Sequence, residues 1–135
     1  MKQTDLMIGD IVDYRGEIIK VTSLYAKNGS NEVGFGKYDG VWVDGSVIKP
    51  ITLTPEILIK NGFEKIDGVE KAICREYGHL WVCWDGKFLS VTDRLNTTTR
   101  GGVEQPHILL DIPVKYIHEL QHGLMVCGIT YEIVV

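Results

Sequence analysis

The stretch 113–128, with the sequence PVKYIHELQHGLMVCG, constrains the fold most because it is the longest segment with a helical pattern. Its apolar residues recur every three or four positions and so form one stripe along a helix. Gly128 follows the stripe, as glycine commonly does just past a helix end. The sequence therefore predicts a helix with one buried side. The stripe consists of Pro113, Tyr116, Ile117, Leu120, Leu124 and Cys127.

Residues 1–53 contain short apolar runs separated by turn signals that are rich in glycine, asparagine and aspartate. Strands at such spacing favour a strongly bent antiparallel sheet or a small barrel. The order Gly9-Asp10-Ile11-Val12, Gly16 and Val21 resembles the opening of SH3-like barrels. That architecture serves many binding modules and implies no particular ligand. We therefore predict a small SH3-like β-barrel over 1–53.

Residues 54–135 combine helical and strand patterns. Thr54-Pro55-Glu56 starts a short helix, and Asn61-Gly62 ends it. Strands are expected over 63–66, 107–110 and 129–135, and a three-strand meander over 69–76, 80–84 and 87–91. The polar segment 92–106 is expected to be a long loop. The predicted fold is α+β, with the barrel packed on an antiparallel sheet that the C-terminal helix covers. Because the chain has 135 residues, we expect 1–53 and 54–135 to form one compact unit.

Composition narrows the classes of protein that the chain can belong to. A hydrophobic share of 44% is typical of a soluble globular protein, and the net charge of −4 gives no general attraction to nucleic acid. No apolar run is long enough to span a bilayer, and Asp5 and Asp10 interrupt the region that a signal peptide needs to be apolar. Three irregularly spaced cysteines fit a reducing compartment better than a disulfide framework, so we predict a cytoplasmic protein.

Several segments together resemble a known group of proteins. They are the LMIGD segment at 6–10 with Gly16 and Val21, IKPITLT at 48–54, GFE at 62–64 and VKYIHELQ at 114–121. In this order they resemble short uncharacterised proteins of Bacteroides-type bacteria, their phages and mobile elements. The resemblance implies an accessory or interaction protein without an established activity. The usual helix motif of that group is similar to HQLQN, from which Glu119 and His122 depart.

His118-Glu119-Leu120-Gln121-His122 matches the H-E-x-x-H motif of zinc hydrolases. In such enzymes two histidines bind Zn²⁺ and the glutamate polarises the bound water, while a third protein ligand completes the site. The extended motif would place glycine at 125 and histidine at 128, where this chain has Met125 and Gly128. His107 or Asp111 upstream are the remaining third ligands. A zinc hydrolase with Glu119 as catalytic residue is therefore the alternative, and a non-enzymatic protein without a cofactor is the main prediction.

A second possible metal site uses Cys74, His79 and Cys83, which share one face of a hairpin if the turn falls at 77–78. Their spacing matches no standard zinc module, and free cysteine is commonly a small buried apolar residue. Cys127 is a poor nucleophile because it lies in the apolar stripe, where a thiolate is disfavoured.

Candidate binding residues are aromatic or basic. Trp42, Trp81 and Trp84, if exposed near lysine or arginine, would stack on nucleic-acid bases, which makes a nucleic-acid-binding module another alternative. Arg94 and Arg100 in the predicted loop are available for an anionic partner, since loops often carry function. The sequence thus predicts a cytoplasmic interaction protein whose partner is a protein, with nucleic acid as the competing partner class and no membrane association.

Overall fold

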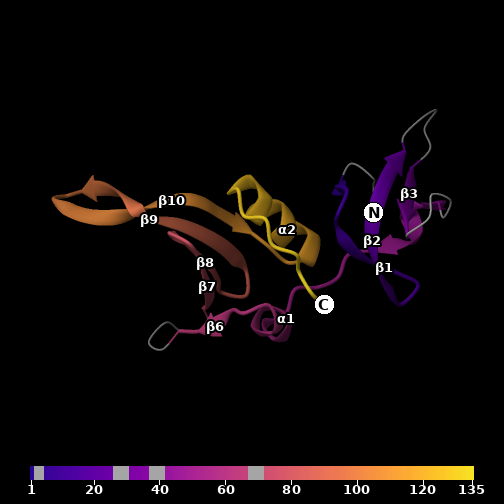
Figure 1. The fold of residues 1–135 in the computed structure, drawn as a ribbon, viewed down its shortest axis with the longest axis horizontal. Helices are drawn as coiled ribbons and strands as arrows, with labels where there is room; N and C mark the ends of the chain where they lie inside the picture. The colour runs from indigo at the N-terminus through magenta and orange to yellow at the C-terminus, as the bar shows by residue number, and fades with distance from the viewer. Residues whose placement is uncertain (2–4, 26–30, 37–41, 67–71) are drawn as a thin grey trace. The chain divides into compact units, whose positions relative to one another are not determined.

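The computed structural model describes residues 1, 5–25, 31–36, 42–66 and 72–135, except the side chains of 96, 98 and 100 (Figure 1). The chain divides into two compact units. Unit 1 comprises Met1–Thr52 with Tyr116–His118, and unit 2 comprises Leu53–Lys115 with Glu119–Val135. Helices and antiparallel sheets are both present, so the predicted α+β class is confirmed.

Unit 1 is an antiparallel sheet with the strand order β4-β3-β2-β1-β5. Among the described residues no pairing joins β4 to β5, so the sheet is open and the predicted closed barrel is not observed. Its core is formed by Leu6, Val12, Val21, Val33 and Ile48. The elements are β1 (Ile11–Tyr14), β2 (Glu17–Tyr25), β3 (Glu32–Phe35), β4 (Trp42–Asp44), the 3₁₀ turn η2 (Gly45–Val47) and β5 (Ile48–Lys49).

Unit 2 is built on a second antiparallel sheet, in which the order β10-β9-β8-β7-β6 follows the chain. Each strand therefore pairs with its neighbour in sequence, as in a meander. The strands are β6 (Glu64–Lys65), β7 (Ile73–Tyr77), β8 (Leu80–Trp84), β9 (Phe88–Arg100) and β10 (Val103–Pro113). The helices that accompany it are α1 (Pro55–Lys60) and α2 (Ile117–Val126). No helix in the described ranges is long and apolar enough to cross a bilayer.

Alternate residues of this sheet point to two different faces. On the covered face, α2 packs closely at Gly123, where an added Cβ would lie 2.9 Å from Leu89 and 3.3 Å from Leu110. Residues one position away in sequence, such as Ser90 and Asp111, therefore belong to the opposite side, which we call the outer face. The register Glu64–Cys74–Cys83–Ser90–Asp111 runs across all of β6 to β10 on the outer face.

The predicted loop at 92–106 is wrong, because this segment is the outer part of the β9–β10 hairpin. Threonine favours strands, and the run Thr97-Thr98-Thr99 continues β9 beyond its pairing with β8. Gly101 and Gly102 form the turn with positive φ values of 57° and 80°, a conformation that glycine adopts without steric cost. Polarity was therefore a misleading sign of irregular structure in this segment.

The two helices end in the same way. The amide of Phe63 donates to the carbonyl of Leu58 at 3.0 Å, and the amide of Ile129 donates to that of Leu124 at 2.9 Å. Gly62 and Gly128, the residues just before these donors, have positive φ values, so both helices end in a Schellman-type motif at the glycines where the sequence predicted their ends. Only the start of the second helix differs from prediction, because Pro113 closes β10 and α2 begins at Ile117.

The predicted last strand at 129–135 is also wrong, since no strand is assigned there. Instead the tail is held by Asn61, which is 1% exposed and makes the backbone hydrogen bonds that a neighbouring strand would otherwise make. Its amide nitrogen donates to the carbonyls of Ile57 and Val134 at 2.7 Å, and its oxygen accepts from the Val134 amide at 2.8 Å. Asn61 thereby satisfies buried backbone groups at the end of α1 and in the tail.

Candidate functional site

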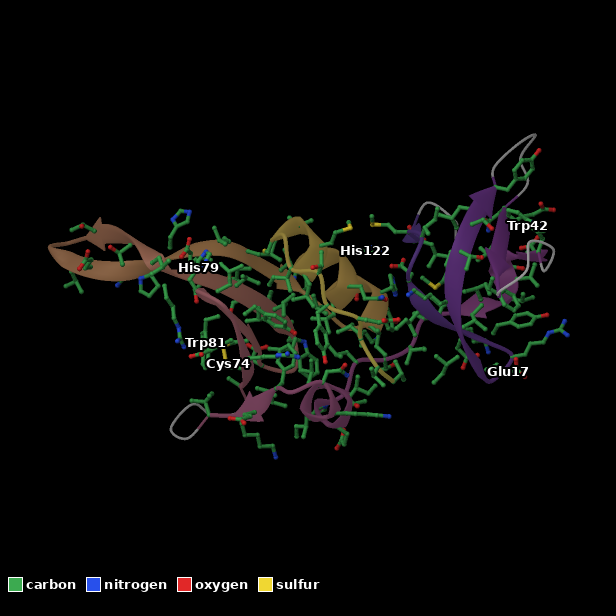
Figure 2. All side chains as sticks on the ribbon, viewed as in Figure 1. Glu17, Trp42, Cys74, His79, Trp81 and His122 are labelled. Atoms are coloured by element: carbon green, nitrogen blue, oxygen red, sulfur yellow. A yellow bond between two sulfur atoms is a disulfide. The ribbon has the colours of Figure 1, made fainter. Side chains whose placement is uncertain are left out.

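A cavity of ≈ 410 Å³ opens on the outer face of unit 2. Its lining among the described residues includes apolar, aromatic and acidic side chains but no lysine, arginine or histidine. Figure 2 shows Cys74 and Trp81 on the side of β7 and β8 that is turned away from α2. We call this cavity the outer-face hollow. It is lined by Ile66, Ala72, Cys74, Trp81, Cys83, Asp85, Phe88, Ser90 and Asp111.

The floor of the hollow contains a disulfide between Cys74 and Cys83. These residues face each other directly on β7 and β8, with Cα atoms 4.1 Å apart. Facing residues of antiparallel strands approach each other this closely at alternate positions of the ladder. The next residue in the same row is Ser90, followed by Asp111 at the edge strand β10. The antiparallel register therefore brings a disulfide, a hydroxyl and a carboxylate together from four strands.

Trp81 is held beside the hollow by contacts on the same face. The guanidinium carbon of Arg94 lies 4.1 Å from the centre of the Trp81 ring, and Arg94 Nη1 lies 2.6 Å from Glu76 Oε1. Stacking on an aromatic ring and a charge-assisted hydrogen bond both restrain the arginine. The charge of Arg94, which was predicted to serve an anionic partner, is thus already compensated within the sheet.

Asp85 supplies a fixed negative charge at the turn between β8 and β9. Its Oδ1 accepts hydrogen bonds from the amides of Phe88 at 2.7 Å and Lys87 at 2.9 Å. These two hydrogen bonds hold the pKa of Asp85 below its usual value of 3.8, with a smaller contribution from the charge of Lys87. The carboxylate is therefore ionised at neutral pH and is oriented by the backbone.

The predicted tryptophan residues do not share one surface. Trp84 is 5% exposed on the covered face, and its indole nitrogen donates to the carbonyl of Val114 at 2.9 Å, so the prediction that it is exposed is wrong. Trp42 belongs to unit 1, is 43% exposed and contacts Tyr25 edge to face. Arg100 lies at the tip of β9, and its side chain is outside the described part of the chain. Trp81 is thus the candidate tryptophan that lines the hollow.

The three polar residues of the H-E-x-x-H motif lie on α2 in different environments. Glu119 Oε1 accepts from the amide of Lys115 at 2.9 Å and so caps the start of the helix. His118 is 6% exposed and stacks on Tyr116 with ring centres 5.8 Å apart. His122 is half-buried. Among the residues that the structure describes, no group of three or more histidine, cysteine, aspartate or glutamate side chains is arranged to hold a metal ion.

The disulfide corrects two predictions about the cysteines. Cys74 and Cys83 cannot act as thiolate ligands together with His79 while they are bonded to each other. His79 lies 3.8 Å from the buried carboxylate of Asp93 instead. The cysteine pattern also no longer supports a reducing compartment, so the cytoplasmic location stays a prediction without that argument. For the remaining Cys127, burial raises the pKa of the thiol, as expected for its place in the apolar stripe.

Sequence reasoning missed most of the residues that line the hollow. Nothing in the sequence distinguishes Phe88, Ser90 and Asp111 from other strand residues as members of a cavity, and aspartate is common in turns such as the one at Asp85. The sequence of Leu80–Trp84 is apolar at every position and gave no such signal, and only the structure shows the alternation of buried and less buried residues in this strand. It marks a face but not a cavity, because the cavity depends on which strands are neighbours.

Comparisons with protein-family models, with curated proteins and with solved structures returned no match. The resemblance to short proteins of Bacteroides-type bacteria and their phages therefore stays a prediction. The functional argument accordingly depends on the geometry of the outer-face hollow.

Proposed function

We propose that the protein is a non-enzymatic interaction protein that binds a segment of a partner protein on the outer face of unit 2. The observation that carries this proposal is the hollow of ≈ 410 Å³, which is of the size that accommodates a side chain or small ligand. Its walls include Trp81 and Phe88, and aromatic residues supply much of the contact energy at protein interfaces.

The construction of the hollow supports a binding role. The disulfide ties two of its strands, and Arg94 restrains Trp81 from one side. A site whose side chains are already restrained loses less conformational entropy when it binds. The exposed Ile108 on β10, in the same row as Trp81, extends the contact surface beyond the hollow.

The SH3-like identity of unit 1 forms a second, finer part of the proposal. In the order β4-β3-β2-β1-β5 the last strand, β5, pairs with the first strand, β1, which is compatible with an SH3-like arrangement. In this proposal unit 1 is an additional interaction module, and the exposed Trp42 and Tyr25 are its contact residues.

A selection experiment with a matched control tests the proposal. Binders are selected from a random peptide library on the purified protein and are then measured against Ser90→Trp, which fills the hollow. The expected result is a loss of binding of at least ten-fold, because the indole would occupy the space needed by the peptide. Ser46→Trp, at an exposed position in unit 1, should leave binding unchanged.

A selection in which every binder is unaffected by Ser90→Trp, or one that yields no binders, would contradict the proposal of a site in the hollow. The zinc hydrolase and nucleic-acid predictions have direct tests of their own. Stoichiometric zinc in the purified protein that is lost on His118→Ala would support the hydrolase, and a salt-dependent gel shift would support nucleic-acid binding.

A further inference from the structure

We infer that the outer-face hollow selects a basic side chain, so that the partner segment presents a lysine or arginine to it. This inference rests on the proposed function and adds the chemistry of the ligand. It follows from charge, because Asp85 and Asp111 line the hollow, and none of its described lining residues is basic. A cationic head group would find complementary charge there, whereas an acidic segment would be repelled.

The walls of the hollow suit the stem of such a side chain. Lysine and arginine carry several methylene groups below their charge, and these groups pack on apolar surfaces while the charge stays near water or an anion. Trp81, Phe88 and the disulfide supply the apolar surface, and the two carboxylates supply the anions. The hollow therefore combines both properties that a long basic side chain needs.

Asp85 is prepared for this role before any ligand binds. Its Oδ1 is engaged by two backbone amides, which fix the carboxylate in the turn and also lower its pKa. A preorganised charge costs little to bring into contact with a cation. Asp111 lies at the edge strand β10 in the same row as the disulfide.

The basic groups near the outer face do not cancel this charge. Arg94 is paired with Glu76 and stacked on Trp81. The amino group of Lys87 lies 5.4 Å from the centre of the Phe88 ring and offsets part of the acidic charge. Glu64, in the same register row as Cys74, adds a further carboxylate to this face. Among the described residues named here, the four carboxylates Glu64, Glu76, Asp85 and Asp111 therefore outnumber the two basic groups of Lys87 and Arg94.

The test uses three short peptides that differ at one position. The probes are acetyl-Gly-Gly-Lys-Gly-Gly-amide and its counterparts with norleucine or glutamate in place of lysine. Binding is followed by the NMR signals of the indole N–H groups, which separate Trp81 in the hollow from the buried, hydrogen-bonded Trp84. The lysine peptide should shift the Trp81 signal until it saturates. The norleucine peptide should bind with at least five-fold lower affinity, and the glutamate peptide should cause no shift.

Charge-neutral variants then locate the selectivity. Asp85→Asn and Asp111→Asn preserve side-chain shape and should each lower the affinity for the lysine peptide about two- to five-fold, as expected for partly exposed charge pairs. Neither variant should change the affinity for the norleucine peptide. Asp44→Asn is the matched control, because Asp44 also accepts a turn hydrogen bond, from the Ser46 amide at 2.8 Å, but belongs to unit 1. If Asp85→Asn fails to fold, the affinity of Asp111→Asn for the lysine peptide alone decides whether the carboxylates select the basic side chain.

The outcomes separate this inference from the proposed function. Equal binding of the lysine and norleucine peptides, or unchanged affinity in both aspartate variants, would overturn the inference. So would equal affinity of free n-butylamine, since the ligand would then be a small amine rather than a protein segment. Library binders that are lost in Ser90→Trp but carry no lysine or arginine would leave the proposed function standing and refute the inference.

Discussion

The two faces of the unit 2 sheet are made from the same strands but perform different tasks. On β9, Leu89 points to the covered face and is fully buried, whereas the adjacent Ser90 lines the hollow on the outer face. On β10, Ile112 lies near α2, whereas Asp111 lies in the outer row. Alternation along a strand thus allows one sheet to hold a core on one side and a polar recognition surface on the other.

The difference teaches where stability and recognition reside in this unit. The covered face contributes through burial of apolar area, which is roughly 25 cal/mol per Å². The outer face is tied by a disulfide and by the contacts of Arg94 with Trp81 and Glu76, which leaves carboxylates and aromatic rings accessible. Apart from changes to the disulfide, substitutions on the covered face should therefore affect folding, and substitutions on the outer face should affect binding.

The largest effect is expected from paired truncations of adjacent residues. Leu89→Ala should lower the free energy of unfolding by about 2–5 kcal/mol, because it leaves a cavity under α2. Ser90→Ala, one residue further on, should change it by about 0.5 kcal/mol or less. Urea denaturation followed by circular dichroism measures both. Equal destabilisation by the two variants would break the comparison between the faces.

Removing the disulfide tests the covalent tie of the outer face. A closed loop of this size, with a sequence separation of 9, stabilises a fold by about 2–3 kcal/mol in the chain-entropy model. The double variant Cys74→Ala/Cys83→Ala should therefore unfold at lower urea, and a reductant should destabilise the wild type but not the variant. Cys127→Ala is the control. Alkylation of all three cysteines in unreduced, denatured protein would show that the disulfide is absent.

Removing the buried hydrogen bonds of Asn61 should lower the free energy of unfolding by a similar or smaller amount than removing the disulfide. Asn61→Ala removes hydrogen bonds to Ile57 and Val134 and leaves buried backbone groups unsatisfied, at a cost of about 2 kcal/mol. The tail should then exchange its amide hydrogens faster than the sheet does. Hydrogen exchange measures this, with the exposed Glu132→Ala in the same tail as the control. Unchanged protection of the Val134 amide would contradict the role of Asn61.

The smallest expected effect concerns pH. Because the folded-state pKa of Asp85 is depressed, its hydrogen bonds contribute stability that is present above about pH 3.8 and is lost as the pH falls through the folded pKa. An NMR titration of the Asp85 carboxyl should give a midpoint below 3.8, and Asp85→Asn should unfold with a weaker dependence on pH in that range. A midpoint at or above 3.8 would indicate that the turn hydrogen bonds are not maintained in solution.

Local sequence signals predicted the elements that local chemistry specifies. The start of α1 is one example, because the Thr54 hydroxyl accepts from the Ile57 amide at 3.3 Å and Pro55 occupies the first turn. The glycine stops at Gly62 and Gly128 are another. The turn at Asp85–Gly86 likewise lies between the predicted strands 80–84 and 87–91. In each case the determining contacts lie within a few residues of one another.

Features that depend on distant residues were not predictable in the same way. Asn61 was interpreted as a helix stop, but its buried amide binds Val134, which lies 73 residues away. Cys74 and Cys83 were interpreted as unpaired because their number and spacing show no framework, whereas the hairpin register places them opposite each other. The hollow itself requires side chains from β7, β8, β9 and β10, and only the complete sheet order brings them together.

One measurement tests the central claim most directly, namely that ligands engage the outer face and not the covered face. Isoleucine methyl groups report on both sides, because Ile66 lines the hollow, Ile108 is 61% exposed in the row of Trp81, and Ile112 lies near α2. On titration with the lysine peptide, the methyl signals of Ile66 and Ile108 should shift while that of Ile112 stays in place. A shift confined to Ile112, or equal shifts of all three, would contradict the account.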